Sequence, residues 1–485
     1  MSGQLEAIKK ASFFIEKKNY NEAKKILLEF AENNKNTKLD IKFFFTMYLV
    51  SSGLKDIKNS KRYLEKCLKI DDENHIALNN LANIYLKEGN LIKAEKFYLK
   101  ALNLNKNYLL AIVNLAILYQ DIGKLDVSKK FYLRAIELAP KRISLYFNLS
   151  RIDENFIDDE KINYLINLLK NEKTELSELS YGYFILANYE RKKKNFGSEM
   201  NYLKKANNYN FQSRKLANQE TMHYWNNIIV KKYNNFNFVN KNKNIFFEKL
   251  NPMFIIGLPR SGSTITEVLL RANNDNIYSF GEASIFNGII ANIFRKNEKS
   301  EIDLDFVKDN VSKIFLGRNF DTKRNRFIAK SLENFFYIDV ILKIFPKAKF
   351  INTTRNIEDN IFAIYKQTLS KISWTHSIED ILRYVDNYFK VIDYFKKKYP
   401  DKIFNLKLED LSLKPQEITK KLYNFCDLAW KDDVLEFHKK KDVLISTASN
   451  IQIRDKIQKY DFDRYKPYKI LLKNFLKQYN WLVHK

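Results

Sequence analysis

The sequence is poor in residues that break regular structure and in residues that cross-link chains or bind metals. It holds 11 Gly and 7 Pro among 485 residues. So few breakers exclude collagen-like, propeller-like and low-complexity architectures and favour long helices. The two cysteines, Cys67 and Cys426, cannot form a disulfide framework. With five scattered histidines they also show no zinc-ligand spacing, so no metal site is expected.

Long uncharged hydrophobic runs are missing as well. No such run reaches the length of about 18 residues that a membrane helix needs. Residues 1–19 are polar and Lys-rich and lack the apolar segment of a signal peptide. Together with the cysteine count, these absences predict a soluble protein of a reducing cytoplasm.

Acidic residues are outnumbered, with 57 Asp and Glu against 84 Lys and Arg, so the formal net charge is +27. Such a charge attracts anions, from nucleic acids to phosphorylated or sulfated small molecules. The excess is mostly Lys and accompanies abundant Asn and Ile, which equally fits a compositional bias. Because no nucleic-acid-binding motif is present, no nucleic-acid partner is expected. The remaining composition, 45% hydrophobic and 29% charged, is that of a globular protein, and the length suggests two to four domains.

The first half of the chain repeats itself. Residues 81–85 (Leu-Ala-Asn-Ile-Tyr) align with residues 115–119 (Leu-Ala-Ile-Leu-Tyr) at an offset of 34. The same offset relates Gly89 to Gly123, Ala94 to Ser128, Phe97 to Phe131, Tyr98 to Tyr132, and Ala101 to Ala135. This period predicts pairs of antiparallel helices, with small residues where helices touch and the glycine in the turn. The pattern resembles the tetratricopeptide repeat, in about five or six copies over roughly residues 5–210.

The second half opens on a different pattern. Residues 213–248 are rich in Asn, Lys and aromatics and are predicted to form a helical connector between a repeat array at 1–212 and a domain at 249–485. Residues 253–256 are an apolar run typical of a buried parallel strand. A loop with two glycines and an amphipathic helix at 265–270 follow. A strand, a glycine loop and a helix start together predict an anion-binding cradle.

The loop nearly matches the phosphate loop of nucleoside triphosphatases. The spacing from Gly257 to Gly262 fits, but Ser263 stands where the Lys is needed. No convincing acidic strand end for Mg²⁺ is found either, which makes a kinase or ATPase the weaker alternative. Arg260 inside the loop instead suits an oxyanion, because a guanidinium can donate two parallel hydrogen bonds to it.

Residues 259–264 (Pro-Arg-Ser-Gly-Ser-Thr) after an apolar strand resemble the 5′-phosphosulfate loop of sulfotransferases that use 3′-phosphoadenosine 5′-phosphosulfate (PAPS). A strand at 349–354 followed by Arg355 resembles the 3′-phosphate motif of the same family, although Ala363 stands where that motif has Ser. Lys330 at a further strand end, and residues 447–454, continue the family's order. The whole resembles bacterial sulfotransferases with tetratricopeptide repeats, which are related to the tyrosylprotein branch.

The resemblance implies a role for each residue. Arg260 would hold the phosphosulfate, Lys330 would touch the leaving oxygen and Ser449 would contact the sulfuryl oxygens, with Thr447 as a neighbouring candidate. Glu282 matches the catalytic base of the tyrosylprotein-type enzymes, and no His lies between His223 and His376 to take that place. The implied cosubstrate site comprises Gly257, Arg260, Ser261, Gly262, Ser263, Thr264, Arg355 and Ser449.

The expected protein is therefore a repeat solenoid followed by a three-layer α/β domain with a parallel sheet. Its expected activity is sulfuryl transfer from PAPS to a hydroxyl acceptor, which could be a peptide tyrosine, a carbohydrate or a small phenol. The repeat array could hold a peptide or protein, since such solenoids offer a concave surface. The alternative is a non-catalytic repeat adaptor with a degenerate nucleotide site, which Ala363 favours. Oligomeric state and the number of repeats stay open.

Overall fold

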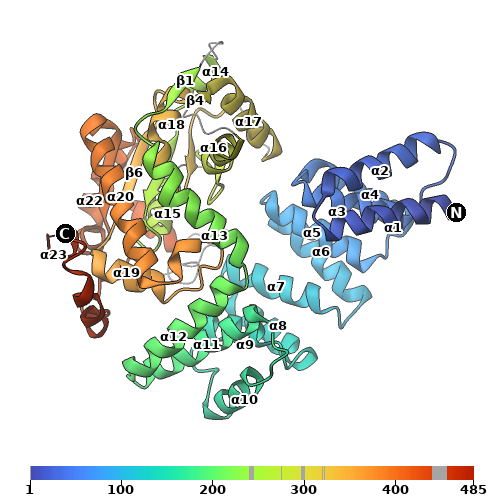
Figure 1. Cartoon of the computed structure of the whole chain (residues 1–485), viewed down its shortest axis with the longest axis horizontal. Coiled ribbons are helices and arrows are strands. Elements are labelled where there is room, and N and C mark those ends of the chain that lie inside the picture. The colour runs from blue at the N-terminus through green and yellow to red at the C-terminus, as the bar shows by residue number, and fades with distance from the viewer. Residues whose placement is uncertain are drawn as a thin grey trace. The chain divides into compact units, whose positions relative to one another are not determined.

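The computed structural model describes residues 2–239, 245–272, 274, 276–296, 301–318, 320–321, 323–439 and 456–484. Internal packing divides the chain into two compact units, Met1–Pro140 and Lys141–Lys485. The predicted repeat array, 1–212, thus extends into the second unit, and its limits as a domain stay a prediction. Figure 1 shows helices alone in the first part of the chain and a mixture of helices and strands in the second.

The first unit consists of helix pairs, as the 34-residue period predicts. Its helices are α1 Ser2–Glu16, α2 Tyr20–Asn33, α3 Ile41–Gly53, α4 Ile57–Ile70, α5 His75–Lys87, α6 Leu91–Leu104, α7 Leu109–Ile122 and α8 Leu125–Leu138. Asn or Asp side chains cap the N-termini of α2 to α6 by accepting from a backbone N–H three residues on.

The repeat register is visible in the packing of the two clearest copies. Tyr85 stacks on Phe97 at 5.3 Å between ring centroids, and Tyr119 stacks on Phe131 at 5.6 Å, one period later. Ala82, Ala94, Ala101, Ala116 and Ala135 are all fully buried between helices. Gly89 and Gly123 have φ of +77° and +86° in the turns, a conformation that favours glycine. The predicted helical pairs with small contact residues are confirmed.

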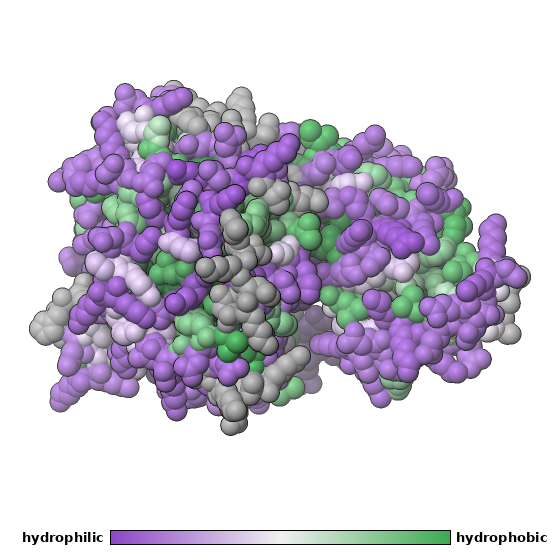
Figure 2. Space-filling view, turned by 90° about the horizontal axis from the view of Figure 1, so that it is seen from above, coloured by the Kyte–Doolittle hydropathy of each residue, from purple (hydrophilic) through white to green (hydrophobic). Residues whose placement is uncertain are grey.

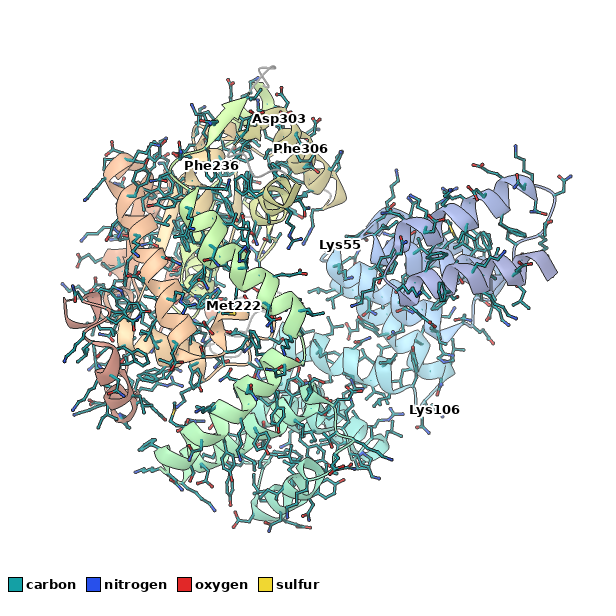
Figure 3. All side chains as sticks on the ribbon, viewed as in Figure 1. Lys55, Lys106, Met222, Phe236, Asp303 and Phe306 are labelled. Carbon is teal, nitrogen blue, oxygen red and sulfur yellow. The ribbon has the colours of Figure 1, made fainter. Side chains whose placement is uncertain are left out.

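The second unit begins with further helices: α9 Ile143–Ile152, α10 Asp159–Leu169, α11 Leu176–Lys192, α12 Phe196–Gln212 and α13 Lys215–His223. A π-helical turn, Tyr224–Ile228, and a short 3₁₀ turn lead into the α/β part. β1 Asn237–Val239 pairs in parallel with β4 Glu301–Asp303 as a small side sheet. Phe236 stacks on Phe294 beside it, and Asp303 caps α17 Leu304–Gly317 by accepting from the N–H of Phe306 at 3.1 Å (Figure 3).

The main sheet of the described residues has five parallel strands in the order β3-β5-β2-β6-β7. These are β2 Met253–Gly257, β3 Tyr278–Ser279, β5 Phe327–Ala329, β6 Lys349–Thr354 and β7 Ile403–Lys407. Helix α14 Ile245–Lys249 precedes these strands. The helices between and after them are α15 Ser263–Arg271, α16 Ile285–Lys296, α18 Ile338–Ile344, α19 Ile357–Tyr365, α20 Ile378–Lys398, α21 Leu408–Leu413, α22 Pro415–Phe425 and α23 Trp481–His484. β2 lies centrally, between β5 and β6. The predicted parallel sheet is confirmed.

Alternating side chains of β2 bury both faces of the sheet. Ile255 belongs to a core with Leu269 of α15 and Leu422 of α22. Phe254 points the other way, where its ring lies 6.0 Å from Phe286 of α16 and 6.2 Å from Phe345. Helices therefore cover both faces of the sheet, which is the three-layer arrangement expected for parallel strands.

Within the second unit a buried ion pair fastens α12 to the α/β part. Glu199 is 1% exposed and receives Lys366, just after α19, at 2.7 Å. The hydroxyl of Tyr468 donates to the other oxygen of Glu199 at 2.6 Å. Asn207 of the same helix donates to the carbonyl of Tyr365 at 3.0 Å. Helix α12 is thus bound to the α/β part through an ion pair and two hydrogen bonds.

The surface is mostly polar. Figure 2 shows hydrophilic residues over most of the visible face, with smaller apolar patches between them. None of the helices in the described ranges combines the length and apolar character that a membrane crossing needs. In the same ranges, no group of His, Cys, Asp or Glu side chains is placed to hold a metal ion.

Removing Glu199 is expected to destabilise the second unit. Glu199→Ala leaves the ammonium of Lys366 buried without its carboxylate, which costs about 3–5 kcal/mol. All four tryptophans, Trp225, Trp374, Trp430 and Trp481, lie in this unit, so their fluorescence during urea unfolding measures it selectively. The control is Lys421→Ala, which breaks an exposed pair with Glu417 and should change stability by under about 0.5 kcal/mol. Equal effects of the two variants on the free energy of unfolding would contradict a stabilising role for the buried Glu199–Lys366 pair.

His376 is expected to make the same unit acid-sensitive. Its ring packs edge-on to Phe211 at 5.9 Å, and neither ring nitrogen has a hydrogen-bond partner among the described residues. Burial first, and then the charge of Arg214, lower its pKa from 6.5 to about 4. Between these values the unfolded chain binds the proton and the folded chain does not, so stability falls as the pH drops from 6.5 to 4, by about 3 kcal/mol. Between pH 7 and 4.5, the free energy of unfolding of His376→Phe should fall by about that much less than that of the wild type, as measured by urea unfolding. Parallel pH profiles would refute this.

Candidate active site

The glycine loop forms between β2 and α15 because its backbone adopts angles that few residues accept. Gly257 has φ of +130°, Arg260 +65° and Gly262 +96°. A Cβ on Gly257 would lie 2.4 Å from the carbonyl oxygen of Thr353 in β6, and one on Gly262 would lie 2.9 Å from Leu408. Gly257 therefore needs glycine for close approach as well as for φ, whereas Gly262 needs it mainly for φ, because the Leu408 side chain can move.

The loop is fastened to β6 and α19. The hydroxyl of Ser261 donates to the carbonyl of Leu258 at 2.6 Å and lies 2.8 Å from the hydroxyl of Thr353. Asn360 of α19 donates to the carbonyl of Pro259 at 2.8 Å. Ser261 is 1% exposed, so its hydroxyl serves the loop's own structure. These bonds hold the loop in one conformation.

The start of α15 faces the loop without a side-chain cap. Gly262 is the N-cap residue and has no side chain that could accept from the first N–H groups, which begin at Ser263. Uncapped N–H groups and the positive end of the helix dipole favour an anion. Ser263 and Thr264 lie in this first turn and are both at most 8% exposed.

Lys330 occupies the end of β5 as the central cation of the site. Its side chain is 1% exposed, and its ammonium lies 3.0 Å from Glu267 and 3.5 Å from Glu282. It also donates to the hydroxyl of Thr264 at 3.3 Å. Thr264, Lys330 and Glu282, which the sequence names separately, are thus brought together. The side chain of Glu282 is 60% exposed, so one carboxylate of this group faces solvent.

Arg355, at the end of β6, lies on the other side of the loop. Its Nη1 donates to the carbonyl of Arg260 at 3.4 Å, and its Nε donates to the hydroxyl of Tyr460 at 2.7 Å. Tyr460 donates in turn to Asp359 at 2.6 Å. The guanidinium lies over the rings of Tyr460 and Tyr465 at about 5.0 and 5.1 Å. Burial lowers the pKa of Arg260 to about 10, and the charge of Arg355 adds to that effect.

Residues 252–432 match the model of the sulfotransferase family. The second half of the chain carries a sulfotransferase-family domain. Residues 73–141 and 49–74 match tetratricopeptide-repeat models, so the chain joins such repeats to this domain. The combination that the sequence resembles is confirmed.

Individual relatives are distant. An uncharacterized protein of Aquifex aeolicus (strain VF5) is 27% identical over 335 residues, which cover 64% of this chain and 42% of that protein. The sulfotransferase domain of the Synechococcus PCC 7002 olefin synthase is 17% identical, with a TM-score of 0.33 over 45% of this chain and 88% of that one. A sulfotransferase from Mycobacterium tuberculosis H37Rv is 13% identical, with a TM-score of 0.28 over 58% of this chain and 92% of that one.

The sequence also singles out Ser449, Thr447 and Ala363. Ser449 and Thr447 lie outside the described residues. Ala363 is buried within α19 at 3% exposure and offers no hydroxyl.

Three residues near the candidate site, Glu267, Glu333 and Tyr460, have roles that the sequence does not predict. Burial alone would raise the pKa of Glu267, but Lys330 and Ser279 hold it below its ordinary value. Burial raises the pKa of Glu333, which accepts from Ser284 at 3.3 Å, and the charge of Glu282 adds to this. Tyr460 orients Arg355. Glu267 carried one usable signal, since it is an acid on the buried face of the predicted helix; the other two carried none.

The loop is expected to tolerate no side chain at Gly257. Gly257→Ala forces a Cβ against the Thr353 carbonyl at a φ that alanine disfavours, and should cost about 2 kcal/mol or more. Gly288→Ala is the matched control, because Gly288 lies within α16 with open space around its Cβ position. That change should stabilise by about 0.5–1 kcal/mol. Urea unfolding followed by tryptophan fluorescence gives both values, and a neutral Gly257→Ala would contradict the close contact.

Proposed function

We propose that the protein transfers a sulfuryl group from PAPS to a hydroxyl acceptor. The observation that carries the proposal is the convergence of a glycine loop at a helix N-terminus, Arg355 and Lys330 at the carboxyl ends of three adjacent parallel strands. Ligands of open α/β sheets bind at this edge. Two cations and a helix N-terminus suit a donor with negative charge at both ends, and the glycines leave room for a phosphate against the backbone.

In this proposal the loop N–H groups and Arg260 bind the phosphosulfate, while Arg355 binds the phosphate at the other end. The reaction forms a bond between the acceptor oxygen and sulfur and breaks the bond between sulfur and the bridging phosphate oxygen. Lys330 would stabilise negative charge on that leaving oxygen, because its ammonium is held in place by Glu267. Positioning and charge stabilisation would supply most of the catalysis.

Glu282 is the proposed general base. The proton leaves the acceptor hydroxyl as the new bond forms, and a carboxylate 3.5 Å from Lys330 would be close enough to the proposed leaving oxygen to accept that proton. Its exposed side chain can meet an acceptor that arrives from solvent. Glu333 is a second carboxylate close by, but burial raises its pKa and Ser284 already engages it. Glu282 is therefore the better candidate.

The acceptor class stays open among peptide tyrosine, carbohydrate and small phenol. Tetratricopeptide repeats bind peptides or proteins in general, so the array would present an acceptor chain or a partner. The proposal keeps the cytoplasm as the compartment, because Cys67 and Cys426 are both free thiols.

Nucleotide binding is the first test. Adenosine 3′,5′-bisphosphate at about 100 times its Kd should add about 2.7 kcal/mol of apparent stability to the wild type. The thermal shift should be absent with ATP and lost in Arg260→Ala, while Lys421→Ala keeps it. Absence of any shift at millimolar nucleotide would overturn the proposal.

The second test concerns catalysis by Glu282. In Glu282→Gln the thermal shift with nucleotide should remain, while sulfated product disappears in assays that supply PAPS and a panel of acceptors. The adaptor alternative instead expects no product from either the wild type or the variant.

A further inference from the structure

A second basic pocket lies within the second unit, apart from the loop. It has a volume of about 240 Å³. Its basic lining residues are Arg151, Arg191, Lys192, Lys366 and Arg464. Glu154 is the acidic member of the lining, and Ser150, Asn188 and Thr368 add uncharged polar groups. Positive charge dominates, even though Glu199 already neutralises Lys366.

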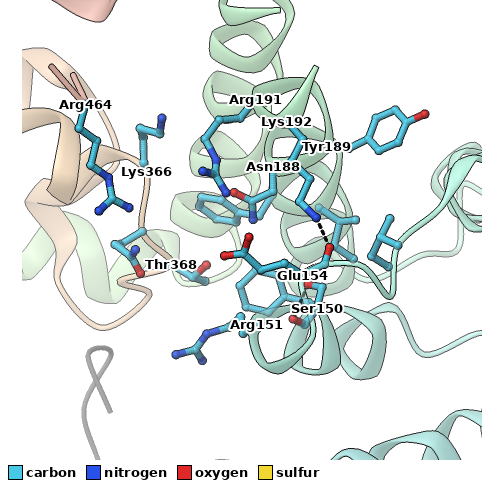
Figure 4. A pocket seen from close by; sticks show the side chains of 15 residues that line it. Ser150, Arg151, Glu154, Asn188, Tyr189, Arg191, Lys192, Lys366, Thr368 and Arg464 are labelled. Atoms are coloured by element: carbon cyan, nitrogen blue, oxygen red, sulfur yellow. Dashed lines mark hydrogen bonds between the residues drawn. The ribbon is translucent and has the colours of Figure 1, made fainter. Parts of the chain in front are cut away.

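The pocket is built jointly by the repeat-type helices and the sulfotransferase domain. Arg151 belongs to α9 and Arg191 to α11, whereas Lys366 follows α19. Figure 4 shows Lys366 and Arg464 facing Arg191 across the pocket, with the carboxylate of Glu154 projecting into it. Lys192 donates to the backbone carbonyl of Glu154 and so fixes that wall. Two walls that are far apart in sequence therefore carry the same charge toward one space.

The pocket adjoins the proposed nucleotide site through one aromatic ring. Tyr465 lies under the guanidinium of Arg355 at 5.1 Å and under the ammonium of Lys366 at 5.8 Å. Arg464, the preceding residue, lies over the same ring at 5.7 Å. Burial is the main cause that lowers the pKa of Lys366, to about 8, and the charges of Arg191 and Arg464 act in the same direction. The positive field is therefore continuous from Arg355 into the pocket.

The volume of the pocket and the chemistry of its lining residues restrict the class of ligand that it can bind. Pockets for drug-sized molecules span roughly 300–1,000 Å³, so this one suits a smaller group. Arginine forks bind phosphate and sulfate oxygens in pairs. A lone carboxylate among them accepts hydrogen bonds, which sugar hydroxyls next to the anion can donate.

We infer that this pocket binds a phosphate or sulfate monoester that carries neighbouring hydroxyl groups, and that α9 and α11 supply part of the site. The inference rests on the proposed function for its placement beside the nucleotide. The monoester has two possible sources: the ribose 3′-phosphate end of the nucleotide, or an anionic sugar on the acceptor. Either source makes the repeat-type helices part of the binding machinery.

The test compares Arg191→Gln and Arg464→Gln, from the two walls, with wild type. Lys170→Gln is the control, because Lys170 is exposed at the end of α10, away from the pocket lining. Calorimetry of the full chain first gives the affinity ratio of adenosine 3′,5′-bisphosphate to 5′-AMP. If the pocket takes the 3′-phosphate, this ratio should fall about tenfold or more in both variants. Thermal unfolding by tryptophan fluorescence confirms that each variant folds, and two variants keep the test valid if one does not.

The second arm titrates ribose 5-phosphate, with ribose as the uncharged control, into free protein and protein saturated with adenosine 3′,5′-bisphosphate. A separate acceptor site predicts binding to wild type in both states, weakened about tenfold or more in both variants, with the nucleotide ratio unchanged. If wild type and both variants agree in both arms, the pocket inference is overturned. A wild type that binds neither nucleotide but binds ribose 5-phosphate through Arg191 would sink the proposed function and retain the pocket.

Discussion

The position of the candidate site depends on one close contact, between the end of β2 and β6. The Thr353 carbonyl occupies the space where a side chain at Gly257 would begin. That approach lets Ser261 reach Thr353 and lets α19 hold the loop through Asn360. With the loop fixed over the central strand, strand order alone sets Lys330 on one side and Arg355 on the other.

The parts of this arrangement that the sequence predicts are those with local signals. The 34-residue period, the strand-loop-helix pattern and the cations at strand ends each lie within a short window. Glu333 and Tyr460 could not be found in that way, because their partners are distant in sequence. Tyr460 meets Arg355 across 105 residues, and nothing in the intervening sequence marks the pairing. The division after Pro140 also has no signal in the sequence, since repeat-type helices continue beyond it.

The repeat-type helices after residue 140 end against the α/β part. A helical repeat buries one face on the next repeat, so the last one needs a cap. In the second unit the α/β part takes that place, through Asn207, Glu199 and the ring of Phe196 packed on Tyr468. A cap formed by the α/β part ties the last repeat-type helices to the part of the chain that carries the candidate site.

The Glu199–Tyr468 bond also bears on biosynthesis. Its partners are separated by 269 residues, and at about 5–20 residues per second the ribosome needs roughly 10 seconds to a minute to bridge them. Until then α12 lacks the hydroxyl that donates to its buried carboxylate, although Lys366, which pairs with the same carboxylate, has already been synthesised. The helices of the first unit can pack while translation continues, whereas the docking of α12 on the α/β part is complete only once Tyr468 has been synthesised. A chain that is cut short before Tyr468 would therefore leave α12 incompletely packed and more open to proteases.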